Sequence, residues 1–89
     1  MCGILGIISH HQLPNIAKEN FRRALDTISH RGPDDSGIYS SQNVLLGHRR
    51  LSILDLSTHG HQPMLTESKD LVLTYNGEVY NHPSLRKKL

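Results

Sequence analysis

A short apolar run followed by one amphipathic helix limits what the first third of this chain can form. Residues 3–9 are apolar apart from glycine and serine, which predicts a buried strand almost at the N-terminus. From Asn15, apolar residues recur at steps of three and four as far as Ile28, which predicts a helix reaching about His30. Gly32-Pro33 ends it, because proline lacks the N–H that another helical turn needs.

The remainder of the chain favours short strands joined by turns. The strongest signal is Asn76-Gly77 between two β-favouring runs, a pair typical of hairpin turns. The elements predicted after the helix are a loop at 31–37, strands at 38–40 and 44–47 joined by a turn at 41–43, an irregular apolar segment at 51–56, a turn-rich segment at 58–63, hairpin strands at 71–75 and 78–80, and the first turns of a helix at 83–89. One early helix among such strands predicts an α+β fold with a largely antiparallel sheet.

Length and charge exclude several classes of protein. A chain of 89 residues forms one small domain, here residues 1–89, whose buried surface gives marginal stability. The net charge of +2 argues against nucleic acid as a partner, because that would need a clustered basic face. The longest apolar stretch, Ile4–Ile8, is too short to cross a membrane and follows no basic segment of the kind found in signal peptides. We therefore expect a cytoplasmic protein with no membrane contact.

The cysteine and histidine content raises the question of a metal site. A single cysteine cannot form an internal disulfide, and the seven histidines show no ligand spacing. His59 and His61 form an isolated H-x-H, and His10 and His11 are adjacent. Structural zinc sites need thiolates or regularly spaced ligand pairs. We therefore expect no metal site, and histidines that lie exposed in loops.

Cys2 follows the initiator Met1, and we expect Met1 to be removed because cysteine is small. The mature chain would then carry a thiol and an α-amine on one residue. The amine titrates near ~7.7–8.0 and the thiol near ~8.5, so the amine can take the thiol proton and activate a nucleophile. The alternative is a buried structural cysteine, since free cysteine commonly packs as a small hydrophobe. Taken alone, Cys2 fits that alternative better.

The segments around Cys2 change this interpretation, because five of them together resemble a known family. They are, in order, Cys2-Gly-Ile-Leu-Gly-Ile, Arg31-Gly-Pro-Asp-Asp-Ser-Gly, Gly47-His-Arg-Arg-Leu-Ser-Ile-Leu-Asp-Leu-Ser, Gly60-His-Gln-Pro-Met and Tyr75-Asn-Gly-Glu-Val-Tyr-Asn-His. The series resembles the glutaminase domain of glutamine-hydrolysing asparagine synthetases, a class II glutamine amidotransferase domain. The resemblance runs from Cys2 to about Arg86. It implies an N-terminal nucleophile hydrolase fold, an αββα sandwich.

The resemblance also implies roles for the residues that match. Cys2 would attack the side-chain amide of L-glutamine, giving a glutamyl thioester and ammonia. Arg50 would hold the substrate α-carboxylate, for which the fork of a guanidinium is well suited. Backbone groups of Leu51 and Ile53 would line the same pocket. The alternative for Arg50 is a surface arginine beside Arg49.

A second group of matching residues lies at the Asn-Gly pair. Asn76 and Gly77 would form the oxyanion hole, and Glu78 would bind the substrate α-amine. Donors to an oxyanion contribute about 3–4 kcal/mol each. The alternatives are a hairpin turn with no catalytic role for Asn76-Gly77 and a solvent-facing strand residue for Glu78.

The Arg31–Gly37 segment is a signature of the resembled family, and we expect it to support the catalytic terminus without contacting substrate. Asp34 and Asp35 could instead form a carboxylate pair, but adjacent loop residues have no fixed separation, as such a pair requires.

Several parts of the resembled enzymes have no counterpart in these 89 residues. One is an aspartate residue that completes the site for the substrate amine. The other is the synthetase domain, which would use ATP and Mg²⁺ to activate a carboxylate substrate, aspartate or another, for reaction with ammonia. We therefore expect this chain to be part of a longer protein and to be inactive alone. The expected partners are L-glutamine, the synthetase domain and further copies in a homo-oligomer. The alternatives are a non-catalytic assembly module and a plain structural domain.

Overall fold

Two antiparallel sheets and two helices form the fold in a computed structural model that describes residues 2–51, 60–77 and 80–89. The elements are β1 (Gly3–Ile8), α1 (Asn15–Thr27), a 3₁₀ turn η1 (Ser29–Arg31), β2 (Asp35–Ser40), β3 (Val44–Arg50), β4 (Met64–Leu65), β5 (Val72–Leu73) and α2 (His82–Lys88). The α+β class with antiparallel sheets is confirmed. It fits the N-terminal part of the expected hydrolase fold.

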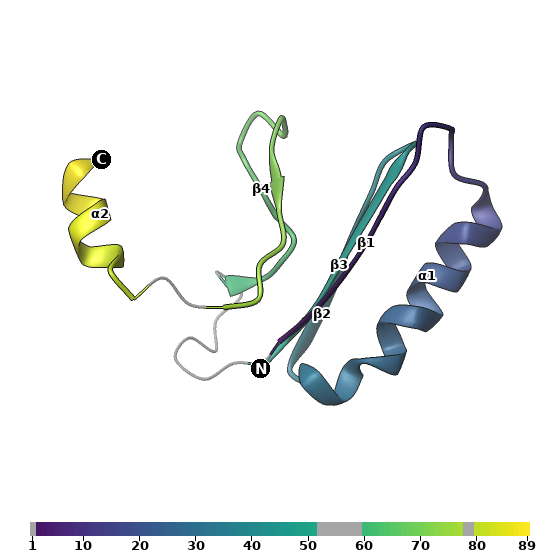
Figure 1. The fold of residues 1–89 in the computed structure, drawn as a ribbon, viewed down its shortest axis with the longest axis horizontal. Coiled ribbons are helices and arrows are strands. Elements are labelled where there is room, and N and C mark those ends of the chain that lie inside the picture. The colour runs from purple at the N-terminus through teal and green to yellow at the C-terminus, as the bar shows by residue number, and fades with distance from the viewer. Residues whose placement is uncertain (1, 52–59, 78–79) are drawn as a thin grey trace.

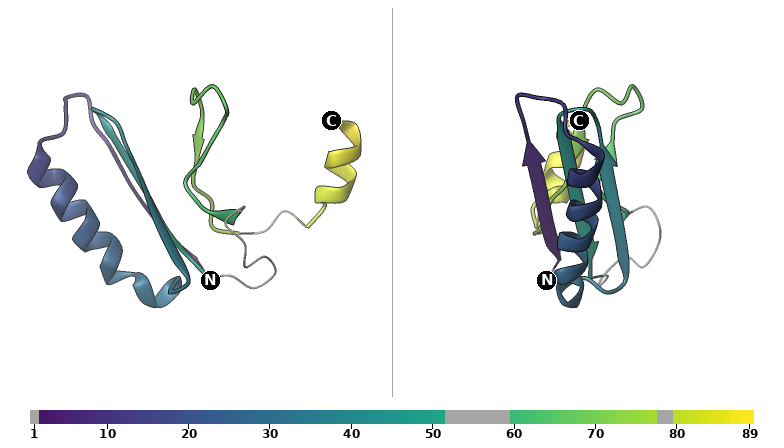
Figure 2. Two further views of the ribbon diagram at one scale, coloured as in Figure 1. Left: turned by 180° about the vertical axis from the view of Figure 1, so that it is seen from behind. Right: turned by 90° about the vertical axis from the view of Figure 1, so that its right-hand side faces the viewer.

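The larger sheet has β3 at its centre, in the order β1-β3-β2, with both pairings antiparallel. His48 of β3 lies opposite Ile4 of β1 and Gly37 of β2. Helix α1 lies along one face of this sheet, and the smaller β4-β5 sheet lies beyond the other face, with α2 farther out (Figure 1). The right-hand view of Figure 2 shows α1 in front of the strands of this sheet.

The hydrophobic core lies between α1 and the sheet. Phe21 and Leu25 of α1 are 2% exposed and Leu45 of β3 is 1% exposed. A Cβ atom at Gly47 would lie 3.0 Å from the Phe21 ring and 3.1 Å from Leu25. The absence of a side chain at Gly47 therefore lets the helix approach the central strand closely.

The side chains of β3 alternate between the two faces of the sheet, as the two-residue period of a strand requires. Leu45, Gly47 and Arg49 face α1. His48 and Arg50 face the other way, toward residues 60–77, because His48 contacts Tyr75 and Arg50 packs against Gly60. This second face carries the candidate site.

Two predicted boundaries were wrong near the Arg31–Gly37 segment. β2 begins at Asp35 instead of residue 38, and β3 continues to Arg50 instead of ending at residue 47. Backbone pairing explains both differences: Pro33 forms a bridge with Arg50, and the Asp34 N–H donates to the Arg50 carbonyl at 3.0 Å. Loop-like composition did not prevent these residues from joining the sheet.

The first strand of the predicted hairpin at 71–80 is shorter than expected. β5 covers only Val72–Leu73, and among the described residues it pairs with β4. A turn closes that hairpin, in which the Thr66 N–H donates to Leu71 O at 3.1 Å and Lys69 has a φ of 63°. Residues 78 and 79 of the expected return strand lie outside the described residues, and Tyr80 lies in a turn before α2. An Asn-Gly pair signals a turn without selecting the strand partner.

The helices agree more closely with expectation. α1 begins at Asn15 as predicted and is continued by η1 to Arg31, and α2 begins one residue before Pro83. Within the described residues, neither helix is long and apolar enough to cross a membrane.

Candidate active site

Cys2 is half-buried, and its thiol lies against the backbone at the end of β3. The Leu51 N–H donates to Cys2 Sγ at 3.3 Å, and Sγ lies 3.8 Å from the Leu51 carbonyl oxygen. Gly3 pairs with Arg49, so continuing the antiparallel register by one residue sets Cys2 opposite Arg50. The sheet thus brings together three of the residues predicted for the site, Cys2, Arg50 and Leu51.

The backbone of Cys2 is held by a residue of the Arg31–Gly37 segment. Arg31 Nε donates to the Cys2 carbonyl oxygen at 3.2 Å. The next residue, Gly32, lies so close to the Arg49–Arg50 peptide that a Cβ atom would overlap it. Only glycine permits this approach. The segment therefore contacts both the catalytic candidate Cys2 and the end of β3, which agrees with its expected supporting position.

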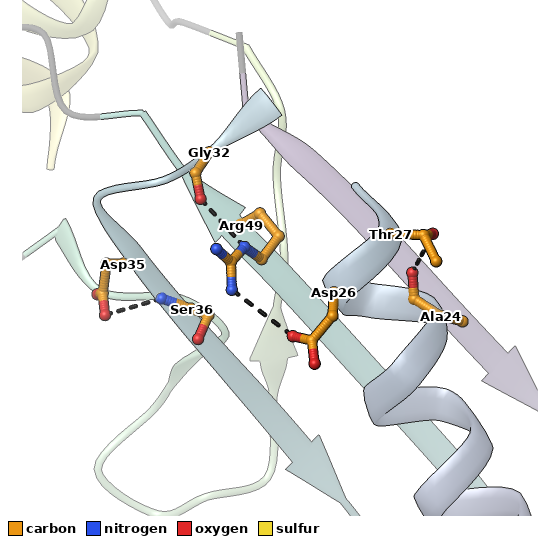
Figure 3. Close-up of polar contacts among 7 residues, drawn as sticks. All are labelled: Ala24, Asp26, Thr27, Gly32, Asp35, Ser36 and Arg49. Atoms are coloured by element: carbon orange, nitrogen blue, oxygen red, sulfur yellow. Dashed lines mark hydrogen bonds and ion pairs between the residues drawn. The ribbon is translucent and has the colours of Figure 1, made fainter. Parts of the chain in front are cut away.

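Arg49 belongs to the helix side of the sheet (Figure 3). Its Nε donates to the Gly32 carbonyl oxygen at 3.1 Å, and Nη1 lies 3.9 Å from Asp26 Oδ1 on α1. These contacts link β3 to α1 and to Gly32, the residue that follows η1. Arg49 therefore has structural partners on the face away from residues 60–77.

Arg50 is on the opposite face and is only 8% exposed. A Cβ atom at Gly60 would lie 2.7 Å from Cζ of Arg50, so Gly60 packs directly against the guanidinium. Asp35 of β2 lies opposite Arg50 in the register. The surface-arginine alternative is wrong, because Arg50 is buried. A buried charge needs charged or polar groups that compensate it.

Asp35 pairs with His61, whose Nδ1 lies 2.5 Å from Asp35 Oδ2. The hydrogen bond from His61 is the main effect that lowers the pKa of Asp35 below its ordinary 3.8, and the charge of Arg50 acts in the same direction. The pair holds residues 60–63 against β2, where a Cβ atom at Gly37 would lie 2.8 Å from the His61 ring. The carboxylate of Asp35 is thus engaged with histidine.

His48 contradicts the expectation that the histidines lie exposed in loops, because it sits on β3 and is 1% exposed. Burial lowers its pKa below the ordinary 6.5, so the ring is neutral at neutral pH. Nε2 lies 3.1 Å from the Tyr75 carbonyl oxygen and must carry the proton that it donates. Nδ1 has no hydrogen-bond partner among the described residues. A buried polar atom without a partner costs about 1–3 kcal/mol.

Asn76 and Gly77 follow a firmly held residue. The Tyr75 N–H donates to Gln62 Oε1 at 2.6 Å, while the Tyr75 carbonyl accepts from His48. Gly77 has a φ of 155°, and a Cβ atom there would lie 2.7 Å from the Tyr75 hydroxyl. Glycine is therefore required at this position on both counts.

The structure brings the predicted residues together only in part. Cys2, Arg50 and Leu51 meet at the end of β3, and Asn76-Gly77 is tied to β3 through Tyr75. No hydrogen bond joins Cys2 to Asn76 or Gly77 within the described part of the chain. Ile53 and Glu78 lie outside the described residues. Among the residues that are described, no group of three or more His, Cys, Asp or Glu side chains is arranged to hold a metal ion.

Sequence reasoning missed His48 and Gln62, which bind the peptide groups of Tyr75. A signal was present for His48: it stands two residues before Arg50 in a strand, so both must share a face. Gln62 carried no such signal, because it belongs to a turn-rich segment without a period.

Comparison with known proteins places the sequence of this chain in a family. The model of the glutamine amidotransferase domain family matches residues 1–89. The chain is 45% identical, over 97% of its length, to asparagine synthetase B (glutamine-hydrolyzing) of Escherichia coli strain K12. It is 43% identical over its whole length to asparagine synthetase (glutamine-hydrolyzing) 3 of Bacillus subtilis strain 168, and 39% identical to asparagine synthetase (glutamine-hydrolyzing) 1 of Arabidopsis thaliana. It spans only 15 to 20% of the length of the curated relatives that it matches. The chain belongs to the glutamine amidotransferase domain family.

Proposed function

We propose that this chain supplies the nucleophile and part of the substrate site of a glutaminase. After removal of Met1, the α-amine of Cys2 takes the proton from Sγ, and the thiolate attacks Cδ of glutamine. The amine returns the proton to the departing nitrogen, which leaves as ammonia, and a glutamyl thioester remains. Water then adds to the thioester with the amine as base, releasing glutamate and restoring the thiol. The net reaction is glutamine plus water to glutamate plus ammonia.

The observation that carries this proposal is the position of Cys2 at the end of β3. Its thiol is half-buried against the Leu51 backbone and its carbonyl is held by Arg31. Arg50 lies opposite it in the extended register. A buried guanidinium beside a thiol can orient an amino acid through its α-carboxylate, with the amide toward the nucleophile.

The other site residues complete the proposal. Asn76 and Gly77 donate to the oxyanion that forms as Sγ attacks, and Glu78 binds the substrate α-amine. Backbone groups of Leu51 and Ile53 line the pocket. Gly77 supports an oxyanion role because its φ of 155° requires glycine, so no side chain stands beside its backbone N–H.

In the complete protein, ammonia then passes to a carboxylate substrate. The names of the matched relatives, asparagine synthetases (glutamine-hydrolyzing), support a synthetase domain in the complete protein. That domain would use ATP and Mg²⁺ and take aspartate as the acceptor. The cytoplasm is the proposed location. The partners are L-glutamine, the synthetase domain and, in a homo-oligomer, further copies.

The nucleophile can be tested in the complete protein with Cys2→Ala. Release of glutamate from glutamine should stop, while synthesis with added ammonium continues, because that reaction needs no thiol. Unchanged glutamine hydrolysis in the variant would refute the assignment. Loss of the ammonium-dependent reaction as well would point to misfolding, which a melting curve would reveal.

A further inference from the structure

Both peptide groups of Tyr75 are bound by side chains from other parts of the fold. His48 Nε2–H donates to the carbonyl oxygen at 3.1 Å, and Gln62 Oε1 accepts from the N–H at 2.6 Å. Thr74 adds a longer contact, from its hydroxyl to the Gly47 carbonyl at 3.5 Å. Residues 74 and 75 are thus attached to β3 and to the 60–63 segment, although they follow a strand of only two residues.

Attachment of Tyr75 fixes the residue that follows it. The peptide bond is planar, so the Tyr75 carbonyl oxygen, the Asn76 nitrogen and the Asn76 Cα lie in one plane. A hydrogen bond to that oxygen therefore restrains the Cα from which the Asn76 side chain projects. The second bond, to the Tyr75 N–H, restrains rotation at the preceding end of the residue.

We propose that His48 and Gln62 are positioning residues that hold Asn76 where its amide can donate to the oxyanion, an inference that rests on the proposed role of Asn76. His48 stands on the central strand, two residues before Arg50 and on the same face. One rigid strand thereby sets both the carboxylate clamp and the oxyanion donor. Sites built on such elements keep their geometry better than sites on loops.

The chemistry of His48 favours this role over a purely structural one. An apolar side chain of similar size would fill the same buried space without leaving Nδ1 unpartnered among the described residues. A general-base role is also disfavoured, because Nδ1, the nitrogen that carries the free lone pair when Nε2 donates to Tyr75, is buried away from solvent. The ring acts through Asn76.

The test is a mutant cycle in the complete protein, with steady-state glutamine hydrolysis as the readout. His48→Leu should lower kcat by about 10- to 100-fold and leave KM for glutamine nearly unchanged, since a misplacement near 1 Å can cost ~10²-fold. His48→Gln keeps an N–H donor of similar reach and should retain most of kcat. His48→Leu added to Asn76→Ala should reduce kcat little further, because the group it positions is already gone.

The outcomes separate the two ideas. The positioning role would be overturned, with Asn76 still a donor, by either of two results. One is a fall in kcat in the double variant equal to the product of the falls in His48→Leu and Asn76→Ala, and the other is wild-type kcat in His48→Leu. Wild-type kcat in Asn76→Ala would instead remove Asn76 from the proposed function. If His48→Leu does not fold, as judged by its melting curve, Gln62→Leu repeats the test from the other side of the Tyr75 peptide, and wild-type kcat in it would overturn the proposal.

Discussion

Arg49 and Arg50 are neighbours in the chain, but they lie on opposite faces of the central strand. Arg49 reaches Asp26 of α1 and the Gly32 carbonyl, whereas Arg50 is buried beneath Gly60 on the face that also carries His48. The two-residue period of a strand causes this division. It provides a matched pair of arginines, one in the proposed substrate site and one outside it.

Arg50→Ala in the complete protein should raise KM for glutamine by about 10- to 100-fold with little change in kcat. A charge-assisted contact to a carboxylate is worth about 1.5–3 kcal/mol, and that carboxylate does not change during the reaction. Arg49→Ala is the control: it should lower the melting temperature and leave KM unaltered. Similar KM increases in both variants would mean that Arg50 acts only through stability.

Asn76→Ala should lower kcat for glutamine hydrolysis by about 10²–10³, because a donor to an oxyanion acts in the transition state. KM should change little. Ammonium-dependent synthesis, measured in the same preparation, is the internal control for folding. If kcat were unchanged and only the melting temperature fell, Asn76-Gly77 would be a turn without a catalytic role.

Gly32→Ala should destabilise the fold far more than Gly6→Ala. A Cβ atom at Gly32 overlaps the Arg49–Arg50 peptide, and backbone cannot move aside as a flexible side chain does. At Gly6 the nearest neighbour is the end of the Leu46 side chain, 3.3 Å away. Crowding of this kind costs about 1–3 kcal/mol. Urea unfolding of the two variants measures the difference, and equal midpoints would show that the Arg31–Gly37 segment does not lie against β3.

His48 should make stability depend on pH in a specific range. Its pKa is lowered by burial, so the unfolded chain binds a proton near the ordinary 6.5 while the folded chain does not. The contribution of the neutral His48 ring to the stability of the fold is therefore complete above about pH 6.5, and it is lost as the pH falls toward the pKa of His48 in the folded chain. Asp35, with a pKa below 3.8, loses its contribution only in stronger acid.

The measurement is the melting temperature of wild type and His48→Gln from about pH 7.5 to about pH 5. The melting temperature of wild type should fall more than that of the variant as the pH is lowered across this range, because the variant has no titrating group at position 48. Parallel curves would mean that residue 48 is not buried as a neutral ring.

The sequence allowed the strand at 3–9 and the first helix to be anticipated, but not the pairing of later strands. Periodicity defines a local element, whereas the partner of β5 was decided by a turn at residues 66–71 that closes β4 against it. Loop composition likewise hid the backbone pairing of Pro33 and Asp34 with Arg50.

The site showed the same limit. Cys2, Arg50 and Asn76 could be named because their motifs resemble a family. His48 and Gln62 were missed because their importance comes from distances across the fold, between residues 27 and 13 positions apart in the chain. Local sequence carries little information on such contacts.

The central claim is that Cys2, as the first residue of the mature chain, attacks glutamine. The most direct measurement is peptide mass spectrometry of the complete protein after incubation with 6-diazo-5-oxo-norleucine, an electrophilic glutamine analogue. We predict a single adduct, on an N-terminal peptide that begins with Cys2, and protection by excess glutamine. An adduct on another residue, or glutamine hydrolysis by a chain that retains Met1, would contradict the claim.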